Sequence, residues 1–109
     1  MKKLRELTDA KIESGRQNNP EFMNGVDAII EQEKAFEKGK DAIKIGQKAP
    51  DFELPNAEGK SIVLKSLLEK GPVVITFYRG NWCPYCNLQL RVLQARLDDI
   101  YALGATLVA

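Results

Sequence analysis

The stretch that decides the fold is residues 73–86, which read VVITFYRGNWCPYC. Residues 73–78 are almost continuously apolar or β-branched, a pattern typical of a strand buried on both faces in a sheet with helical cover. A short loop follows, and apolar residues then recur every three or four positions over residues 83–103, which predicts one long helix. The stretch therefore predicts a central strand, a loop and a helix that begins with the pair Cys83 and Cys86.

The residues that follow this helix predict a second strand. Gly104 is a typical helix end, and residues 105–109 read ATLVA, which favours a buried strand parallel to the first. A strand, helix and strand form the nucleus of a doubly wound sheet, which usually has about five strands. We therefore expect an incomplete sheet, either because a longer protein continues it or because a second copy of the chain completes it.

The residues before residue 73 predict a hairpin and a short helix. Residues 52–54 and 61–64 alternate apolar and polar side chains in part, and residues 55–60 between them have turn chemistry. Ser66 and Glu69 fit a capping box that would begin a short helix ended by Gly71. These elements predict a mixed α/β domain over residues 44–109.

Residues 1–40 form a separate, highly charged region with a helical pattern. A break is expected at residues 14–19, after which Asn19 can cap a second helix that begins at Pro20 and ends near Gly39. Amphipathic surface helices usually pack on their own domain, and binding to a partner is the alternative. The region is predicted to be a helical N-terminal extension.

Composition narrows the function classes. The 109 residues are 44% hydrophobic, enough for one modest core. The 16 Lys and Arg residues against 15 Asp and Glu residues give a net charge of +1, which disfavours nucleic acid and anionic membranes as partners. The start of the chain lacks the apolar run of a secretion signal, and no apolar stretch is long enough to span a bilayer. These features predict a soluble cytoplasmic protein.

The cysteine pair indicates redox chemistry. Unpaired N–H groups and the helix dipole at a helix start favour a thiolate, and two sulfurs three residues apart can react with each other. A disulfide across so short a loop would add little stability. Zinc normally takes four ligands, and a chain with two Cys and no His offers too few, so no metal is expected. Two inert buried thiols are the remaining alternative.

Two segments carry a resemblance to a known family. Residues 46–55, GQKAPDFELP, are similar to the N-terminal signature of the peroxiredoxin family of alkyl hydroperoxide reductase and thiol-specific antioxidant type, and residues 74–86 are similar to the strand and active-site loop of that family. Over residues 44–109 the resemblance implies a thioredoxin-like fold and a thiol-dependent, antioxidant peroxidase that reduces hydrogen peroxide or organic hydroperoxides. It implies no cofactor, and a thiol reductant such as thioredoxin, glutaredoxin or glutathione as partner.

The resemblance also implies roles for individual residues. Cys86 takes the place of the peroxide-attacking thiolate, and Cys83 stands where the family usually has Thr or Ser. Arg79, Trp82 and Tyr78 are the predicted substrate-binding or activating residues. For Trp82, which is predicted from its place beside the cysteine pair, packing within the domain is the alternative, and for Arg79 the alternative is a solvated surface charge. A thioredoxin-like or glutaredoxin-like site is the enzymatic alternative, in which Cys83 attacks and Cys86 resolves. A redox-sensing module, whose disulfide alters how residues 1–40 bind a partner, is the non-enzymatic alternative.

Overall fold

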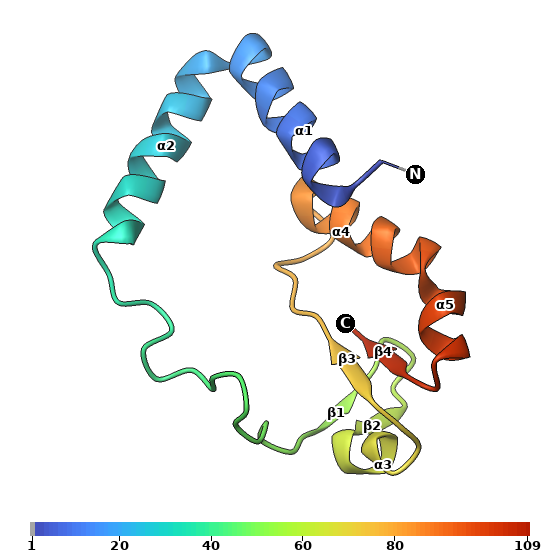
Figure 1. The fold of residues 1–109 in the computed structure, drawn as a ribbon. Coiled ribbons are helices and arrows are strands. Elements are labelled where there is room, and N and C mark those ends of the chain that lie inside the picture. The colour runs from blue at the N-terminus through green and yellow to red at the C-terminus, as the bar shows by residue number, and fades with distance from the viewer. Residues whose placement is uncertain (1) are drawn as a thin grey trace. The chain divides into compact units, whose positions relative to one another are not determined.

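The structure is a computed structural model that describes residues 2–109 (Figure 1). The chain divides into two units, one that ends at Lys48 and one that comprises Ala49–Ala109. Helices are mixed with two small sheets of two strands each, which confirms the predicted α/β class in this coarse form. None of the helices in the described residues is long and apolar enough to cross a membrane.

The first unit contains helices α1 (Leu4–Asn18) and α2 (Pro20–Lys34). The predicted cap of α2 is confirmed, because Asn19 Oδ1 accepts a hydrogen bond from the backbone N–H of Phe22 at 3.3 Å. The expected break over residues 14–19 is wrong in its extent, since α1 continues to Asn18 and only Asn19 interrupts the helices. Helix α2 ends at Lys34 rather than near Gly39, and residues 35–52 form turns and irregular chain.

The two helices of the first unit meet through one buried side chain and one ion pair. Met23 is buried and lies against Gly15, where an added Cβ would come within 3.0 Å of the Met23 sulfur. Arg16 donates two hydrogen bonds to the Asp27 carboxylate, at 2.7 and 3.1 Å, and this hydrogen bonding holds the pKa of Asp27 below its usual value. A small residue opposite Met23 thus lets α1 and α2 approach closely.

The second unit begins with the predicted hairpin, which the structure confirms. Strands β1 (Glu53–Pro55) and β2 (Ser61–Val63) are antiparallel, with Leu54 opposite Ile62. Asn56 shapes the turn, because its Oδ1 accepts hydrogen bonds from the backbone N–H groups of Glu58 and Lys60 at 3.0 and 2.9 Å.

Helix α3 (Leu64–Leu68) follows directly on β2. The predicted capping box is wrong, because Ser66 lies inside this helix rather than at its start. Asp51 binds the first turn of α3 instead, since its Oδ1 accepts a hydrogen bond from the backbone N–H of Lys65 at 3.1 Å. Leu64 is buried at 3% exposure and anchors the helix.

Strands β3 (Val73–Ile75) and β4 (Thr106–Val108) pair in parallel, as predicted (Figure 1). Strand β3 ends at Ile75, three residues earlier than predicted, although the N–H of Thr76 still donates to the carbonyl of Val108 at 2.9 Å. The expected burial of this strand on both faces is not found, since β3 has β4 as its one strand neighbour and Val74 is 40% exposed.

The connection between β3 and β4 contains helices α4 (Pro84–Ala95) and α5 (Leu97–Ala102). The prediction of one continuous helix over residues 83–103 is therefore wrong at Arg96. There the backbone leaves helical geometry, with φ −109° and ψ 8°, and the N–H of Arg96 bonds to the carbonyl of Leu93, three residues back. The break tightens the last turn of α4 and changes the direction of the chain.

Candidate redox site

The loop between β3 and α4 presents the cysteine pair at a helix start. Cys83 is the N-cap of α4, with φ −87° and ψ 110°, and its Sγ accepts a hydrogen bond from the backbone N–H of Cys86 at 3.4 Å. Pro84 occupies the first turn, where its missing N–H costs no hydrogen bond. A cysteine thus takes the place that Ser, Thr or Asp usually holds at a helix start.

The loop can take its path because residue 80 is a glycine. Gly80 has a positive φ of 152°, and a Cβ built on it would lie 2.5 Å from Nε1 of Trp82. A larger residue would therefore be strained and would displace the indole.

The two sulfur atoms lie 2.7 Å apart, and the Cys86 thiol donates to Cys83 Sγ. Both cysteines are free, and a disulfide bond of about 2.05 Å would need only a small movement. Their exposure differs, since Cys83 is 1% exposed and Cys86 is half-buried. An external molecule therefore meets Cys86 more readily than Cys83.

Arg79 contacts both cysteines. Its Nη2 donates to Cys83 Sγ at 3.4 Å, and its backbone N–H donates to Cys86 Sγ at 3.5 Å. The same guanidinium lies over the Trp82 ring, 5.1 Å from the ring centroid. Arg79 thus places a positive charge between an aromatic face and the more buried sulfur.

These contacts lower the pKa of Cys83 from an ordinary 9.0 to about 7. The hydrogen bond from the Cys86 thiol is the largest cause; burial opposes it, and the Arg79 guanidinium and the Cys86 backbone N–H lower the pKa further. The same contact with Cys83 raises the pKa of Arg79. Cys83 is therefore ionised to a large extent near neutral pH.

The structure brings together four of the five residues that the sequence predicted for the site, namely Cys83, Cys86, Arg79 and Trp82. Tyr78 is 45% exposed and takes part in none of the hydrogen bonds or ring contacts found among residues 2–109. Its predicted role stays a prediction. No group of three or more potential metal ligands occurs in this described part of the chain.

Sequence reasoning missed two amide side chains on α4. Asn87 Nδ2 donates to the backbone carbonyl of Asn81 at 2.9 Å, and Gln89 Nε2 donates to Thr76 Oγ1 at 2.9 Å. The only sequence signal was the presence of two amides just after the cysteine pair in a helix that is otherwise largely apolar.

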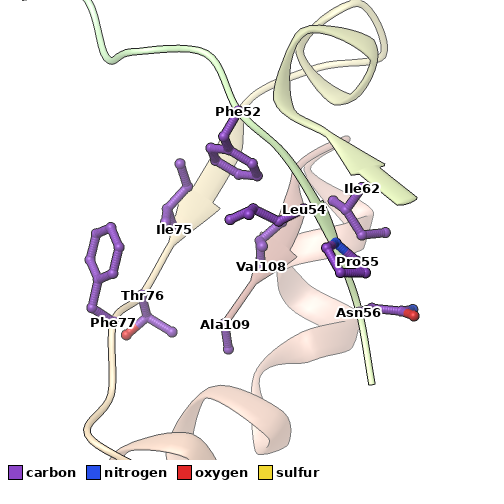
Figure 2. A pocket seen from close by; sticks show the side chains of 10 residues that line it. All are labelled: Phe52, Leu54, Pro55, Asn56, Ile62, Ile75, Thr76, Phe77, Val108 and Ala109. Carbon is purple, nitrogen blue, oxygen red and sulfur yellow. The ribbon is translucent and has the colours of Figure 1, made fainter. Parts of the chain in front are cut away.

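A separate apolar groove of about 360 Å³ lies in the same unit, and Figure 2 shows the side chains that line it. Leu54 of β1, Ile75 of β3 and Val108 of β4 contribute to it, as does Phe77, which is 90% exposed. Neither cysteine lines this groove, nor does Arg79 or Trp82. The groove is therefore not part of the cysteine site.

Comparison with known proteins agrees with this site. The sequence model of the AhpC/TSA family matches residues 45–109, the hairpin, the cysteine loop and both sheets included. The chain belongs to the AhpC/TSA family. This membership confirms the resemblance drawn from residues 46–55 and 74–86.

The relatives of this AhpC/TSA-family chain are named as oxidoreductases of two kinds. It is 38% identical over 66 residues to a putative peroxiredoxin bcp of Helicobacter pylori, covering 61% of this chain and 43% of the relative. It is 32% identical over 76 residues to the thiol-disulfide oxidoreductase ResA of Bacillus thuringiensis, covering 70% of this chain and 43% of the relative. ResA of Bacillus subtilis is 34% identical over 71 residues, which cover 65% of this chain and 38% of the relative.

The AhpC/TSA-family chain spans less than half the length of each of these curated relatives. No solved structure matches it significantly. The comparisons support a redox function of the thioredoxin-fold superfamily, and two different thiol reactions remain open within it.

Proposed function

We propose that this protein is a thiol-dependent peroxidase of the peroxiredoxin-like kind, which reduces hydrogen peroxide or an organic hydroperoxide through Cys86 and Cys83. The observation that carries the proposal is the pair of free sulfurs 2.7 Å apart, one half-buried and the other held next to a guanidinium. Membership in the AhpC/TSA family and the similarity to a putative peroxiredoxin support it.

The first step uses the proton that the two sulfurs share. Cys86 donates its hydrogen bond to Cys83, so transfer of this proton leaves Cys86 as a thiolate and Cys83 as a thiol. The Cys86 thiolate attacks one peroxide oxygen, the O–O bond breaks, and the leaving alkoxide or hydroxide takes up a proton from solvent water. Cys86 becomes a sulfenic acid, and the peroxide is reduced to an alcohol or water. The half-exposed position of Cys86 supports this first contact.

The second step closes the disulfide. The Cys83 thiol gives up the proton that it gained in the first step, and its sulfur attacks the sulfenic sulfur of Cys86. A disulfide forms, the S–O bond breaks, and the hydroxyl leaves as water with that proton. The Arg79 guanidinium and the Cys86 backbone N–H, which both lower the pKa of Cys83, favour the loss of that proton. Two thiol groups of an external reductant, such as thioredoxin, glutaredoxin or glutathione, then reduce the disulfide. The proposal involves no metal and no organic cofactor.

The proposal extends to the architecture that carries the site. The parallel unit β3–α4–α5–β4, with a cysteine at the start of α4, supports a thioredoxin-like fold over residues 44–109, preceded by a helical extension over residues 1–40. A cytoplasmic location and a homo-oligomer that completes the sheet belong to the same proposal.

Thiol-disulfide exchange is the second candidate function. The low pKa of Cys83 at the N-cap of α4 favours it, and the similarity to ResA proteins supports it. In this reaction Cys83 attacks a substrate disulfide and Cys86 resolves the mixed disulfide. Because Cys83 is only 1% exposed, the loop would have to open before a bulky disulfide could reach it.

Stopped-flow oxidation by hydrogen peroxide of Cys83→Ser and Cys86→Ser, each the matched control of the other, tests the proposal. We expect Cys86→Ser to abolish fast oxidation. Cys83→Ser should react once, more slowly than the unaltered chain because serine cannot take up the Cys86 proton, and should retain a sulfenic acid that dimedone traps. A fast reaction in Cys86→Ser that is lost in Cys83→Ser would reverse the two roles.

If neither thiol of the unaltered chain reacts faster than free cysteine, the peroxidase proposal is wrong. Reduction of insulin disulfides would then test thiol-disulfide exchange. A partner that binds residues 1–40 in a redox-dependent manner, without any turnover, would point to a sensing module instead.

A further inference from the structure

Two amide side chains of α4 hold the segment that leads from β3 to the cysteine pair. Gln89 donates to the hydroxyl of Thr76 at 2.9 Å, at the end of β3. Asn87 donates to the backbone carbonyl of Asn81 at 2.9 Å, two residues before the first cysteine. The two hydrogen bonds thus attach both ends of residues 76–81 to the same helix.

We infer that Asn87 and Gln89, named here the amide pair, are positioning residues that hold residues 79–82 in the geometry that stabilises the Cys83 thiolate. The inference deepens the proposed function, since it concerns the same site, but its test does not depend on turnover. Neither amide donates to a sulfur in the described residues, so both act through the loop rather than on the reacting atoms.

The loop has few other attachments near the sulfurs. The N–H of Cys83, the N-cap of α4, donates to the carbonyl of Gly80 at 3.1 Å, which ties the loop to the start of α4 but not to the body of the helix. The backbone N–H of Arg79 reaches Cys86 Sγ at 3.5 Å, a weaker bond to a sulfur acceptor. Attachment of the loop to the body of α4 therefore depends largely on the amide pair.

Loop position matters because Arg79 must reach Cys83. Its guanidinium donates to Cys83 Sγ at 3.4 Å, an ordinary distance for a hydrogen bond to sulfur, and a displacement of about 1 Å would break the contact. Arg79 and Cys86 are the titratable groups with a contact to Cys83 among the described residues. Of these, Cys86 sits on α4 itself, and Arg79 depends on the loop.

The two amides should contribute unequally. Gln89 and Thr76 are both half-buried, and a hydrogen bond shielded from water is stronger than one that water can replace. Asn87 and Asn81 are exposed, so water competes for their bond. Loss of the Gln89 contact should therefore have the larger effect.

The experiment compares Asn87→Leu and Gln89→Leu with Gln94→Leu, each in the reduced full chain. Gln94 is a matched control, because it is an exposed amide on α4 that makes none of the hydrogen bonds described. Thiolate absorbance at 240 nm is followed from pH 4 to pH 10, and far-UV circular dichroism verifies folding. At pH 7 we expect the thiolate fraction to fall about twofold in Asn87→Leu and about fivefold in Gln89→Leu, and to stay unchanged in Gln94→Leu.

A second pair of variants tests the Gln89 contact from the other side. Thr76→Val removes the acceptor at nearly constant size and should lower the thiolate fraction as much as Gln89→Leu does, whereas Thr76→Ser keeps the hydroxyl and should titrate like the unaltered chain. In the double variant Thr76→Val with Gln89→Leu, the thiolate fraction should be as low as in either single variant and no lower, because all three variants lack the same hydrogen bond.

Thiolate titrations of Asn87→Leu and Gln89→Leu that match Gln94→Leu would overturn the inference, and so would additive losses in the Thr76 and Gln89 double variant. If Gln89→Leu does not fold, the contrast between Thr76→Val and Thr76→Ser decides. A chain that shows the expected titrations but does not react with peroxide would keep this inference and refute the proposed peroxidase.

Discussion

Replacement of Arg79 by methionine tests the electrostatics of the site directly. Methionine keeps much of the length of the side chain but removes the guanidinium, which donates to Cys83 Sγ at 3.4 Å. The hydrogen bonds that Cys83 accepts from the thiol and the backbone N–H of Cys86 remain. The pKa of Cys83 should therefore rise above about 7 but stay below the ordinary 9.0.

The expected change in thiolate fraction follows from these limits. With a pKa of about 7, about half of the Cys83 thiols are ionised at pH 7. If loss of Arg79 raises the pKa to about 8, the ionised fraction falls to about one tenth, a decrease of about fivefold. In Arg79→Lys the ionised fraction of Cys83 should lie between that of the unaltered chain and that of Arg79→Met, because an ammonium keeps the charge without the planar donor geometry.

The assay is the absorbance of the first thiolate at 240 nm between pH 4 and pH 10, in fully reduced protein. Arg91→Met is the matched control, since Arg91 is an exposed arginine on α4 without a described contact to either cysteine. A first ionisation in Arg79→Met that coincides with that of Arg91→Met, or that moves to lower pH, would refute the assignment of Arg79 as a group that stabilises the thiolate.

Three further predictions concern stability. The free energy of unfolding should rise between about pH 7 and pH 9, because Cys83 is ionised in the folded state over this range while the thiol of the unfolded chain still binds its proton. Urea unfolding measured across this pH range should show the rise in the unaltered chain and not in Cys83→Ser. Gly71→Ala should lower the free energy of unfolding by about 3 kcal/mol, because φ is positive at this position and the added Cβ would meet the carbonyl oxygen of Gly104. Gly59→Ala should lower it by only about 1 kcal/mol, because φ is positive there but the space around the Cβ is open. Equal midpoints of thermal unfolding for the two variants would contradict this prediction. Asn19→Ala should lower helix stability by about 1 kcal/mol through the lost N-cap, and Asn19→Asp should keep it, as followed by circular dichroism at 222 nm.

Local signals in the sequence were sufficient for the elements around the site. The β-branched run, the turn residues and Asn19 each act within a few positions of the chain, and the presence of β3, the hairpin and the cap of α2 were predicted correctly, although β3 ends three residues early. Cys83 was likewise expected at a helix start, because Pro84 is compatible with the first helical turn.

Contacts between distant positions were not predictable in the same way. Asp51 reaches the backbone of Lys65, and Gln89 reaches Thr76, across 14 and 13 positions respectively. An apolar run shows that a strand is able to be buried, but burial itself depends on the neighbours it finds. Val74 and Phe77, at 40% and 90% exposure, therefore depart from the prediction although the strand itself is present.

The division of properties between the two sulfurs bears on which thiol reaction the site favours. Cys86 has the better access to an external molecule, whereas Cys83, whose pKa is lowered, is 1% exposed, so the stabilised thiolate is not the sulfur that an external molecule reaches first. A short proton transfer between sulfurs 2.7 Å apart resolves this for a small peroxide, because the accessible sulfur gains the charge without any movement of the loop. That proton transfer does not help a reaction in which Cys83 attacks a bulky disulfide. For such a disulfide to reach Cys83, the loop would first have to open and break the hydrogen bonds of Asn87 and Gln89. The closed loop therefore supports the proposed reaction with a peroxide over the alternative proposal of exchange with protein disulfides.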